Sequence, residues 1–259
     1  MNDNRKVIGI FDLFAVFRRA LLIQAAWSFD RMQTLGFAYA IEPALRKVYP
    51  DRAEYAERLR VHLEYFNTQP YLASFIMGAA VRLEEERATG KTEAPDVSRL
   101  KAALMAPLGA LGDSLFWGAL KPLAAAAAAA VLMTGSWWAP FLFLTVFNLW
   151  HLGLRMGMLF WGYASGGDAV ALMGKYHITK MAKRFKLMSL CILGGILGMM
   201  PFWRPEFNPS YHAPGVVVSL SAMLLTLALV AVMRRGGSPV KFMLGLAALC
   251  VALAYAGAV

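Results

Sequence analysis

Apolar residues recur at helical spacing through the first part of the chain. Tyr55, Leu59, Leu63 and Phe66 follow one another at intervals of three or four residues, with charged side chains between them. This spacing places the apolar side chains on one face of a helix. Pro43 is expected to interrupt an earlier helix, because proline cannot continue the helical hydrogen-bond ladder. Residues 1–96 are therefore predicted to form a region of amphipathic helices.

From residue 97 onward the pattern changes to long apolar runs. An α-helix needs ~20 such residues to cross the hydrocarbon core of a bilayer, and the runs come close to that length. Residues 97–259 are therefore predicted to be a membrane-spanning region. The fold class predicted is all-α, a polytopic integral membrane protein, with a polar linker at residues 88–97 between the two regions. The apolar runs cover residues 115–133, 137–163, 187–203, 215–233 and 240–259.

The charges are distributed unevenly between the two regions. The chain has 26 basic and 16 acidic residues; half of the basic residues follow residue 96, but only three of the acidic ones do. The basic residues stand at the ends of apolar runs, which is typical of membrane proteins and argues against a nucleic-acid partner. Residues 175–186 and 234–241 are basic and are expected on the cytoplasmic side. Residues 204–214 are nearly neutral and are expected on the external side.

The reactive residue types do not form a recognisable catalytic or metal-binding motif. The four histidines are scattered, and the two cysteines, Cys191 and Cys250, lie inside apolar runs. No phosphate-binding loop, nucleophile triad or zinc-ligand spacing occurs in the sequence. We therefore expect no catalytic residue, no metal and no cofactor in this chain.

An acidic residue stands in the otherwise apolar segment at residues 104–118. Pro107 and several glycines there discourage one straight helix, so a broken segment is predicted. Ionisable residues in apolar surroundings are energetically costly and often line a polar pathway. Asp113 and the adjacent Ser114 are therefore candidates for a substrate pathway. The alternative is that Asp113 caps a helix that begins at Ser114.

A second polar group lies within the apolar run at residues 137–163. Asn148, His151 and Arg155 are spaced three and four residues apart, which places them on one helical face. This face is expected to meet another helix, a partner subunit or a polar cavity, because polar groups are unfavourable against lipid. Hydrogen bonding between helices and direct contact with a sugar are the two alternatives.

A polar turn lies at the end of the amphipathic region. Asn67, Thr68 and Gln69 precede Pro70 and provide amide and hydroxyl groups of the kind that bind sugar hydroxyls. Proline also ends helices, so an ordinary helix-ending loop is the alternative. Together with the two groups above, these residues are the candidates for a substrate pathway or a subunit interface.

Several longer motifs appear in the order found in one known family. On these motifs the chain resembles the IID component of the mannose/fructose/sorbose phosphotransferase permeases. The resemblance implies a protein of the bacterial inner membrane that crosses it several times. The motifs are Gln24-Ala-Ala-Trp27, Arg31-Met-Gln-Thr-Leu-Gly-Phe37, His62-Leu-Glu-Tyr-Phe-Asn-Thr-Gln-Pro70, Leu83-Glu-Glu-Glu86, residues 104–118, Lys121-Pro122 and residues 147–155.

This resemblance also implies a function. A IID subunit translocates a hexose-type sugar together with a IIC membrane subunit, within a hetero-oligomer in the lipid bilayer. Soluble IIA and IIB components relay phosphate from phosphoenolpyruvate, so phosphoryl transfer is expected on them. The alternative is a regulatory or scaffold subunit that binds these partners and moves no sugar. The chain departs from the usual family residues at Ala106, Lys121 and His151.

Overall fold

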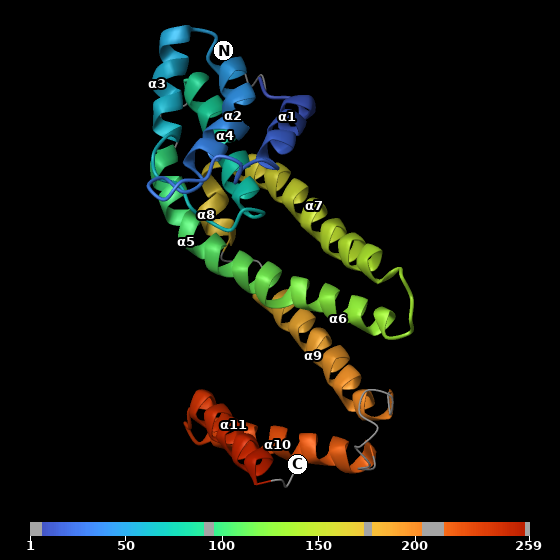
Figure 1. The fold of residues 1–259 in the computed structure, drawn as a ribbon. Coiled ribbons are helices and arrows are strands. Elements are labelled where there is room, and N and C mark those ends of the chain that lie inside the picture. Colours follow the sequence, from blue (N-terminus) through green and yellow to red (C-terminus); the bar gives the residue numbers. More distant parts are fainter. Residues whose placement is uncertain (1–6, 91–95, 174–177, 204–214, 257–259) are drawn as a thin grey trace. The chain divides into compact units, whose positions relative to one another are not determined.

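The computed structural model describes residues 7–90, 96–173, 178–203 and 215–256, which are predominantly helical (Figure 1). The all-α class predicted from the sequence is therefore confirmed. In chain order the elements are α1 (Ile10–Ala20), α2 (Thr34–Val48), α3 (Arg52–His62), α4 (Ala73–Ala88), α5 (Val97–Leu115), the π-helix η1 (Phe116–Leu120), α6 (Lys121–Leu132), α7 (Ala139–Ser165), the 3-10 turn η2 (Gly166–Asp168), α8 (Ala169–Met173), α9 (Ile178–Trp203), α10 (Gly215–Arg234) and α11 (Pro239–Tyr255).

The chain divides into two compact units, Met1–Ile192 and Leu193–Val259. Helices from both sides of residue 96 pack together within the first unit. The division at that residue therefore stays a prediction about which parts enter the membrane. The middle of the linker at residues 88–97 and the expected external segment at residues 204–214 lie outside the described residues.

Helix α2 continues through Pro43, where the sequence predicted an interruption. A proline inside a helix leaves the carbonyl four residues earlier without its usual donor. Here that carbonyl belongs to Tyr39, and the Arg19 guanidinium of α1 donates to it at 3.2 Å. Arg19 also pairs with Glu42 of α2 at 2.6 Å. The predicted interruption is wrong because a tertiary contact replaces the missing donor.

Helix α4 forms the centre of the first unit. Most of its side chains are buried, including Phe75, and α2, α5 and α7 pack around it. It crosses α7 where both helices carry glycine. A Cβ atom on Gly78 would meet the Leu159 carbonyl of α7, and one on Gly162 would meet the Phe75 carbonyl of α4. Glycine at both positions therefore lets the two backbones approach closely.

Helices α5 and α6 form one helical stretch that includes η1. The stretch passes through Pro107 without ending, and the backbone changes from α to π geometry at Phe116. Residues 104–118, for which the sequence predicted a break, are therefore helical, with an irregular turn at their C-terminal end. Residues 97–132 and 139–172 are long and apolar enough to cross a membrane, judged by length and composition.

The second unit contains the end of α9 and a hairpin formed by α10 and α11. The hairpin turn places Gly236 at φ 77°, a left-handed conformation that glycine adopts without strain. The Ser238 hydroxyl then accepts a hydrogen bond from the Lys241 amide at 3.4 Å, at the start of α11. The described side chains along both helices are mostly apolar and exposed. Helices that are apolar on all sides are typical of membrane spans.

Candidate functional site

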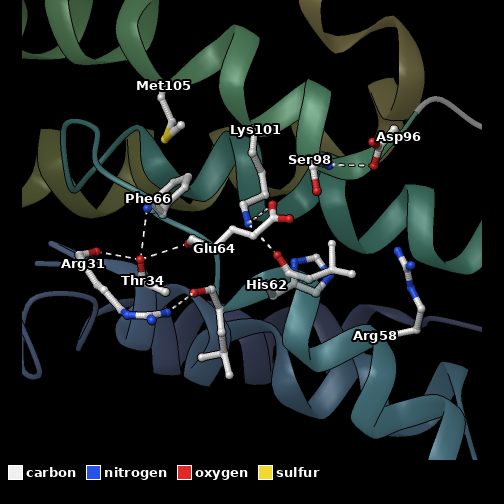
Figure 2. A network of polar contacts seen from close by, with 12 residues as sticks. Arg31, Thr34, Arg58, His62, Glu64, Phe66, Asp96, Ser98, Lys101 and Met105 are labelled. Carbon is white, nitrogen blue, oxygen red and sulfur yellow. Dashed lines mark hydrogen bonds and ion pairs between the residues drawn. The ribbon is translucent and has the colours of Figure 1, made fainter.

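The loop between α3 and α4 is held in place by the segment that leads into α2 (Figure 2). The Thr34 hydroxyl can donate its one proton to the Arg31 carbonyl, at 2.6 Å, or to the Glu64 carbonyl, at 3.0 Å. It also accepts a hydrogen bond from the Phe66 amide at 3.0 Å. The Arg31 guanidinium donates to the Leu63 carbonyl at 3.0 Å. One short segment therefore binds three successive parts of the loop backbone.

Gln33 fixes the next part of the same loop. Its side-chain amide donates to the Thr68 carbonyl at 2.7 Å, and its side-chain oxygen accepts from the Thr68 amide at 3.3 Å. The side chain is only 3% exposed, and an unmet polar group in such a place costs about 1–3 kcal/mol. The motif at residues 31–37 therefore positions the loop. Sequence analysis identified this motif by resemblance and assigned no structural role to it.

Helix α5 is fixed against the other side of the loop. The Thr68 hydroxyl donates to the Met105 carbonyl at 2.8 Å. The Lys101 ammonium donates to the Val61 carbonyl at 3.1 Å and lies 4.0 Å from the Glu64 carboxylate (Figure 2). The Lys101 side chain is almost fully buried. These contacts place one face of α5 directly opposite the polar turn.

An open cavity of about 630 Å³ lies between the turn and α5. Asn67, Thr68 and Gln69 line it from the loop, and Asp113 lines it from the helix. The structure thus brings together four of the eight candidate residues, from two segments that are far apart in the sequence. The complete lining is Tyr65, Asn67, Thr68, Gln69, Pro70, Ala102, Met105, Ala106, Gly109, Ala110 and Asp113.

Gln69 is the most constrained polar side chain of this cavity. Its side-chain oxygen accepts hydrogen bonds from the amides of Tyr71 and Leu72, at 2.8 and 3.0 Å, just before α4 begins. The side chain packs onto Gly112 of α5, where a Cβ atom would collide with it. It is 2% exposed, and among the described residues its Nε2 group has no hydrogen-bond partner. This unpartnered N–H donor is itself buried and is not exposed at the surface of the cavity.

Asp113 lies within α5 and has an exposed side chain. The alternative that Asp113 caps a helix beginning at Ser114 is wrong, because α5 runs through both residues. Ser114 is exposed too but is not part of the cavity lining. An ionised carboxylate accepts hydrogen bonds only, whereas the Asn67 amide at the opposite wall can both donate and accept. The cavity therefore presents both kinds of hydrogen-bonding group.

Asn148, His151 and Arg155 form a line of contacts along α7. The Asn148 side chain donates to the Leu144 carbonyl at 2.8 Å, and its oxygen lies 3.4 Å from Nδ1 of His151. His151 Nε2 is 3.5 Å from the Arg155 guanidinium. Arg155 is 3% exposed and donates to the Ala20 carbonyl at the C-terminal end of α1. A cation there also interacts favourably with the helix dipole.

Tyr71 connects this line of residues to the loop. Its ring centroid lies 4.0 Å from that of His151 and 4.7 Å from that of Phe116 in η1. The Arg155 guanidinium lies 5.7 Å from the centroid of the same ring, within the range of a cation–π interaction. The three polar residues of α7 do not line the cavity. They support Tyr71, which follows the polar turn directly in the chain.

Glu84 of α4 accepts hydrogen bonds in the core from polar side chains of neighbouring segments. It accepts two hydrogen bonds from Arg58, at 2.7 and 2.9 Å, one from Tyr49 at 2.7 Å and one from His62 at 2.9 Å. Burial alone would raise the pKa of Glu84, but the hydrogen bonds from His62, Arg58 and Tyr49 outweigh it and lower the pKa to about 2. Burial lowers the pKa of His62, against the opposing effect of Glu84. This cluster ties α3 to α4 and so fixes where the loop between them begins.

Glu85 performs a similar role for the N-terminal segment. Its carboxylate accepts hydrogen bonds from the amides of Val7 and Ile8, at 2.6 and 2.9 Å, just ahead of α1. It also accepts from the Tyr163 hydroxyl of α7 at 2.6 Å and from Arg82 at 2.8 Å. Sequence analysis recognised residues 83–86 as a motif but did not predict that two of its carboxylates are buried. Charge alone would have suggested a solvated helix end.

Replacing Thr34 with valine is expected to destabilise the loop without changing the shape of the side chain. The Phe66 amide would lose its acceptor in a buried position, at a cost of about 1–3 kcal/mol. Thermal unfolding of the detergent-solubilised protein measures this loss. The matched control is Thr134→Val, because Thr134 is exposed and bonds only to the carbonyl of Val131 within its own turn. Equal stability of the two variants would contradict the role assigned to Thr34.

The comparisons with known proteins agree with one another. Residues 8–259 match the family described as the PTS system mannose/fructose/sorbose family IID component. The mannose-specific EIID component of Escherichia coli (strain K12) is 40% identical over 189 residues, covering 72% of this chain and 66% of that protein. The sorbose-specific EIID component of Klebsiella pneumoniae is 33% identical over 191 residues, covering 73% of this chain and 70% of that protein. The alignment with the Escherichia coli protein thus spans just under two thirds of its length.

Solved structures extend the similarity over almost the whole chain. A chain from the cryo-EM structure of the mannose transporter ManYZ with microcin E492 is 31% identical, with a TM-score of 0.59 and 98% of both chains covered. A second, described as the structure of a membrane protein, has a TM-score of 0.73 at 31% identity, with 97% of this chain and 98% of that chain covered. The resemblance drawn from the motifs is therefore confirmed. The chain belongs to the IID component family of the mannose/fructose/sorbose phosphotransferase system and is a bacterial membrane protein with membrane-spanning helices.

Proposed function

We propose that this chain is the IID translocation subunit of a phosphotransferase permease and carries a hexose-type sugar together with a IIC membrane subunit. The observation that carries the proposal is the cavity between the polar turn and α5. Its lining combines the exposed side-chain amide of Asn67 and the exposed carboxylate of Asp113. A few convergent polar groups in a concave, mostly apolar site are typical of small-molecule recognition.

A sugar fits this chemistry because each hydroxyl group both donates and accepts hydrogen bonds. The carboxylate of Asp113 would accept from one hydroxyl, and the side-chain amide of Asn67 would donate to another. Tyr65 adds a half-exposed aromatic ring to the lining, against which the apolar face of a sugar ring could pack. The related mannose-specific and sorbose-specific proteins support a hexose as the class of substrate.

The cavity is open, so a single chain encloses a substrate only on one side. The polar face of Asn148 and His151 is likewise only partly covered within the first unit. Both features support a membrane partner, and the similarity to a chain from the mannose transporter ManYZ supports the same conclusion. Phosphorylation of the sugar is assigned to IIA and IIB components, which would relay phosphate from phosphoenolpyruvate.

Uptake of labelled hexoses tests the proposal. Cells would express this chain with its IIC, IIA and IIB subunits and carry either the native sequence, Asp113→Asn or Asn67→Ala. We expect each variant to reduce uptake at least about tenfold, which corresponds to the loss of about 1.4 kcal/mol of binding in the translocation pathway. Glu57→Gln, on the exposed surface of α3, is the control and should leave uptake unchanged.

The possible outcomes distinguish a transport subunit from a regulatory or scaffold subunit. Accumulation of sugar phosphate that depends on this chain would support the transport subunit and identify the sugar. A stable complex with the IIC subunit, without any chain-dependent uptake, would instead favour a regulatory or scaffold subunit. Normal uptake by Asp113→Asn and Asn67→Ala, at equal amounts of protein in the membrane, would remove the cavity from the translocation pathway.

A further inference from the structure

Helix α1 is apolar on two faces, and the fold of the first unit uses only one of them. Leu13, Val16 and Ala20 are buried against the neighbouring helices. On the other side Phe11 is 85% exposed and Phe14 is 39% exposed. Isolated exposed apolar residues are common on proteins, but a contiguous exposed apolar patch usually marks an interaction surface.

Exposed apolar side chains continue along the chain beyond the end of the helix. Leu21 and Leu22 follow it directly, and both are exposed. In the next loop the rings of Trp27 and Phe29 contact each other edge to face, with centroids 4.9 Å apart, and Phe29 is 85% exposed. Large apolar side chains are therefore exposed both on the helix and in the loop that follows it.

This surface is continuous with an apolar side of the long helix α7. The Phe14 ring packs edge to face against Phe160 of α7, with centroids 5.7 Å apart. From Phe160 the exposed residues Met156, Leu152 and Leu149 follow at helical spacing along α7. These residues belong to the stretch at 139–172 that is long and apolar enough to cross a membrane. An apolar path thus leads from a membrane helix onto α1.

The last turn of α1 adds positive charge beside this surface. Arg18 is exposed, whereas Arg19 points toward Glu42 of α2. Helices that lie flat in a membrane interface combine a large apolar face, aromatic residues and basic residues that meet anionic headgroups. A tryptophan at the edge, here Trp27, is likewise typical of the interface.

We propose that the outer surface of α1 and of the loop that follows it rests in the interface of the bilayer and contacts lipid. Phe11 and Phe14 reach the boundary of the acyl chains, and Arg18 lies at the level of anionic headgroups. Lipid is the occupant because the surface extends that of a membrane-spanning helix without a polar gap at their contact. In this arrangement α1 anchors the N-terminal helices, and with them the loop that lines the cavity, at a fixed depth.

Fluorescence quenching of the full-length protein tests this proposal. Phe11→Cys and, separately, Phe29→Cys would be introduced after Cys191 and Cys250 have been replaced by serine, and a polarity-sensitive fluorophore attached. The proteins, together with the IIC subunit, would be reconstituted in vesicles of phosphatidylethanolamine and phosphatidylglycerol. We expect nitroxide-labelled acyl chains to remove most of the fluorescence at either position, and iodide in the buffer to have little effect. Glu57→Cys on α3 is the exposed control and should show the reverse.

Three other results would overturn the proposal. Quenching of both labelled positions by iodide, to the same extent as at position 57, would place the surface in water. Protection from both quenchers would mean that protein covers it. Protection that is lost when the IIC subunit is omitted would identify that subunit as the occupant. Using two positions guards against one variant that fails to fold, since Phe11 and Phe29 lie in different segments.

Discussion

Replacing Glu84 with glutamine is expected to lower the free energy of unfolding by about 3–5 kcal/mol, because removing one partner of a buried ion pair leaves an uncompensated charge. Glu84 is 1% exposed and accepts four hydrogen bonds from three side chains. The amide of glutamine keeps the shape but cannot accept both bonds of the Arg58 guanidinium. Thermal unfolding in detergent measures the loss.

The control for this substitution is Glu57→Gln on α3. Glu57 is exposed, and surface charges contribute at most about 1 kcal/mol. We therefore expect its unfolding temperature to stay close to that of the native protein. If Glu84→Gln unfolded at the same temperature as Glu57→Gln, the cluster around Glu84 would not hold α3 to α4.

Lowering the pH should destabilise the same cluster, and the direction of this effect follows from the pKa shifts of Glu84 and His62. The pKa of Glu84 is lowered from 4.5 to about 2, so its contribution is complete above 4.5 and is lost as the pH falls toward 2. The pKa of His62 is lowered from 6.5, so the native state resists protonation of His62, and stability decreases as the pH falls below 6.5. The contribution of Glu84, and with it the difference in stability between the native protein and Glu84→Gln, should therefore shrink as the pH falls from 4.5 toward 2.

Replacing Gly162 with alanine is expected to disrupt the crossing of α4 and α7. The added Cβ would collide with the Phe75 carbonyl, which is backbone and cannot rotate away. Overpacking of cores typically costs about 1–3 kcal/mol, and a collision between two backbones should reach or exceed the upper end of that range. The yield of folded, monodisperse protein and its unfolding temperature in detergent both report this change.

Gly157→Ala on the same helix is the matched control. No heavy atom lies within 4 Å of a Cβ atom built at Gly157. Alanine is favoured over glycine inside a helix by about 0.5–1 kcal/mol, so this variant should be as stable as the native protein or slightly more so. The two substitutions are chemically identical, but we expect them to change the stability in opposite directions. A similar loss of stability in both variants would show that the collision at the crossing does not determine the result.

Neither proline ends a helix where the sequence predicted an end. Pro70 lies in the loop before α4, but α3 already ends at His62, so Leu63 and Phe66 lie in that loop and the helical face predicted for them is wrong. Pro43 lacks a backbone donor, but α2 continues through it because Arg19 supplies a donor to the Tyr39 carbonyl. A rule that depends on neighbours along the chain cannot anticipate a donor from another helix.

The buried carboxylates illustrate the same limit. In the sequence, residues 83–86 look like the charged end of a helix, because acidic residues are almost never buried without partners. The partners of Glu84 come from α3 and from Tyr49, which directly follows α2, and those of Glu85 from the segment before α1 and from α7. Their burial therefore depends on the positions of four other parts of the chain.

By itself, the sequence determined the helical class, the apolar runs, the positions of the charges and, through its motifs, the family. These properties depend on the spacing and composition of residues along the chain, so they follow from the sequence without knowledge of the tertiary structure. Only the tertiary structure decided that Asn67, Thr68 and Gln69 face Asp113 across one cavity, while Asn148, His151 and Arg155 support Tyr71 beside it. Contacts between distant segments are fixed by how α4, α5 and α7 pack, and close packing is a property of the assembled helices and not of any one of them.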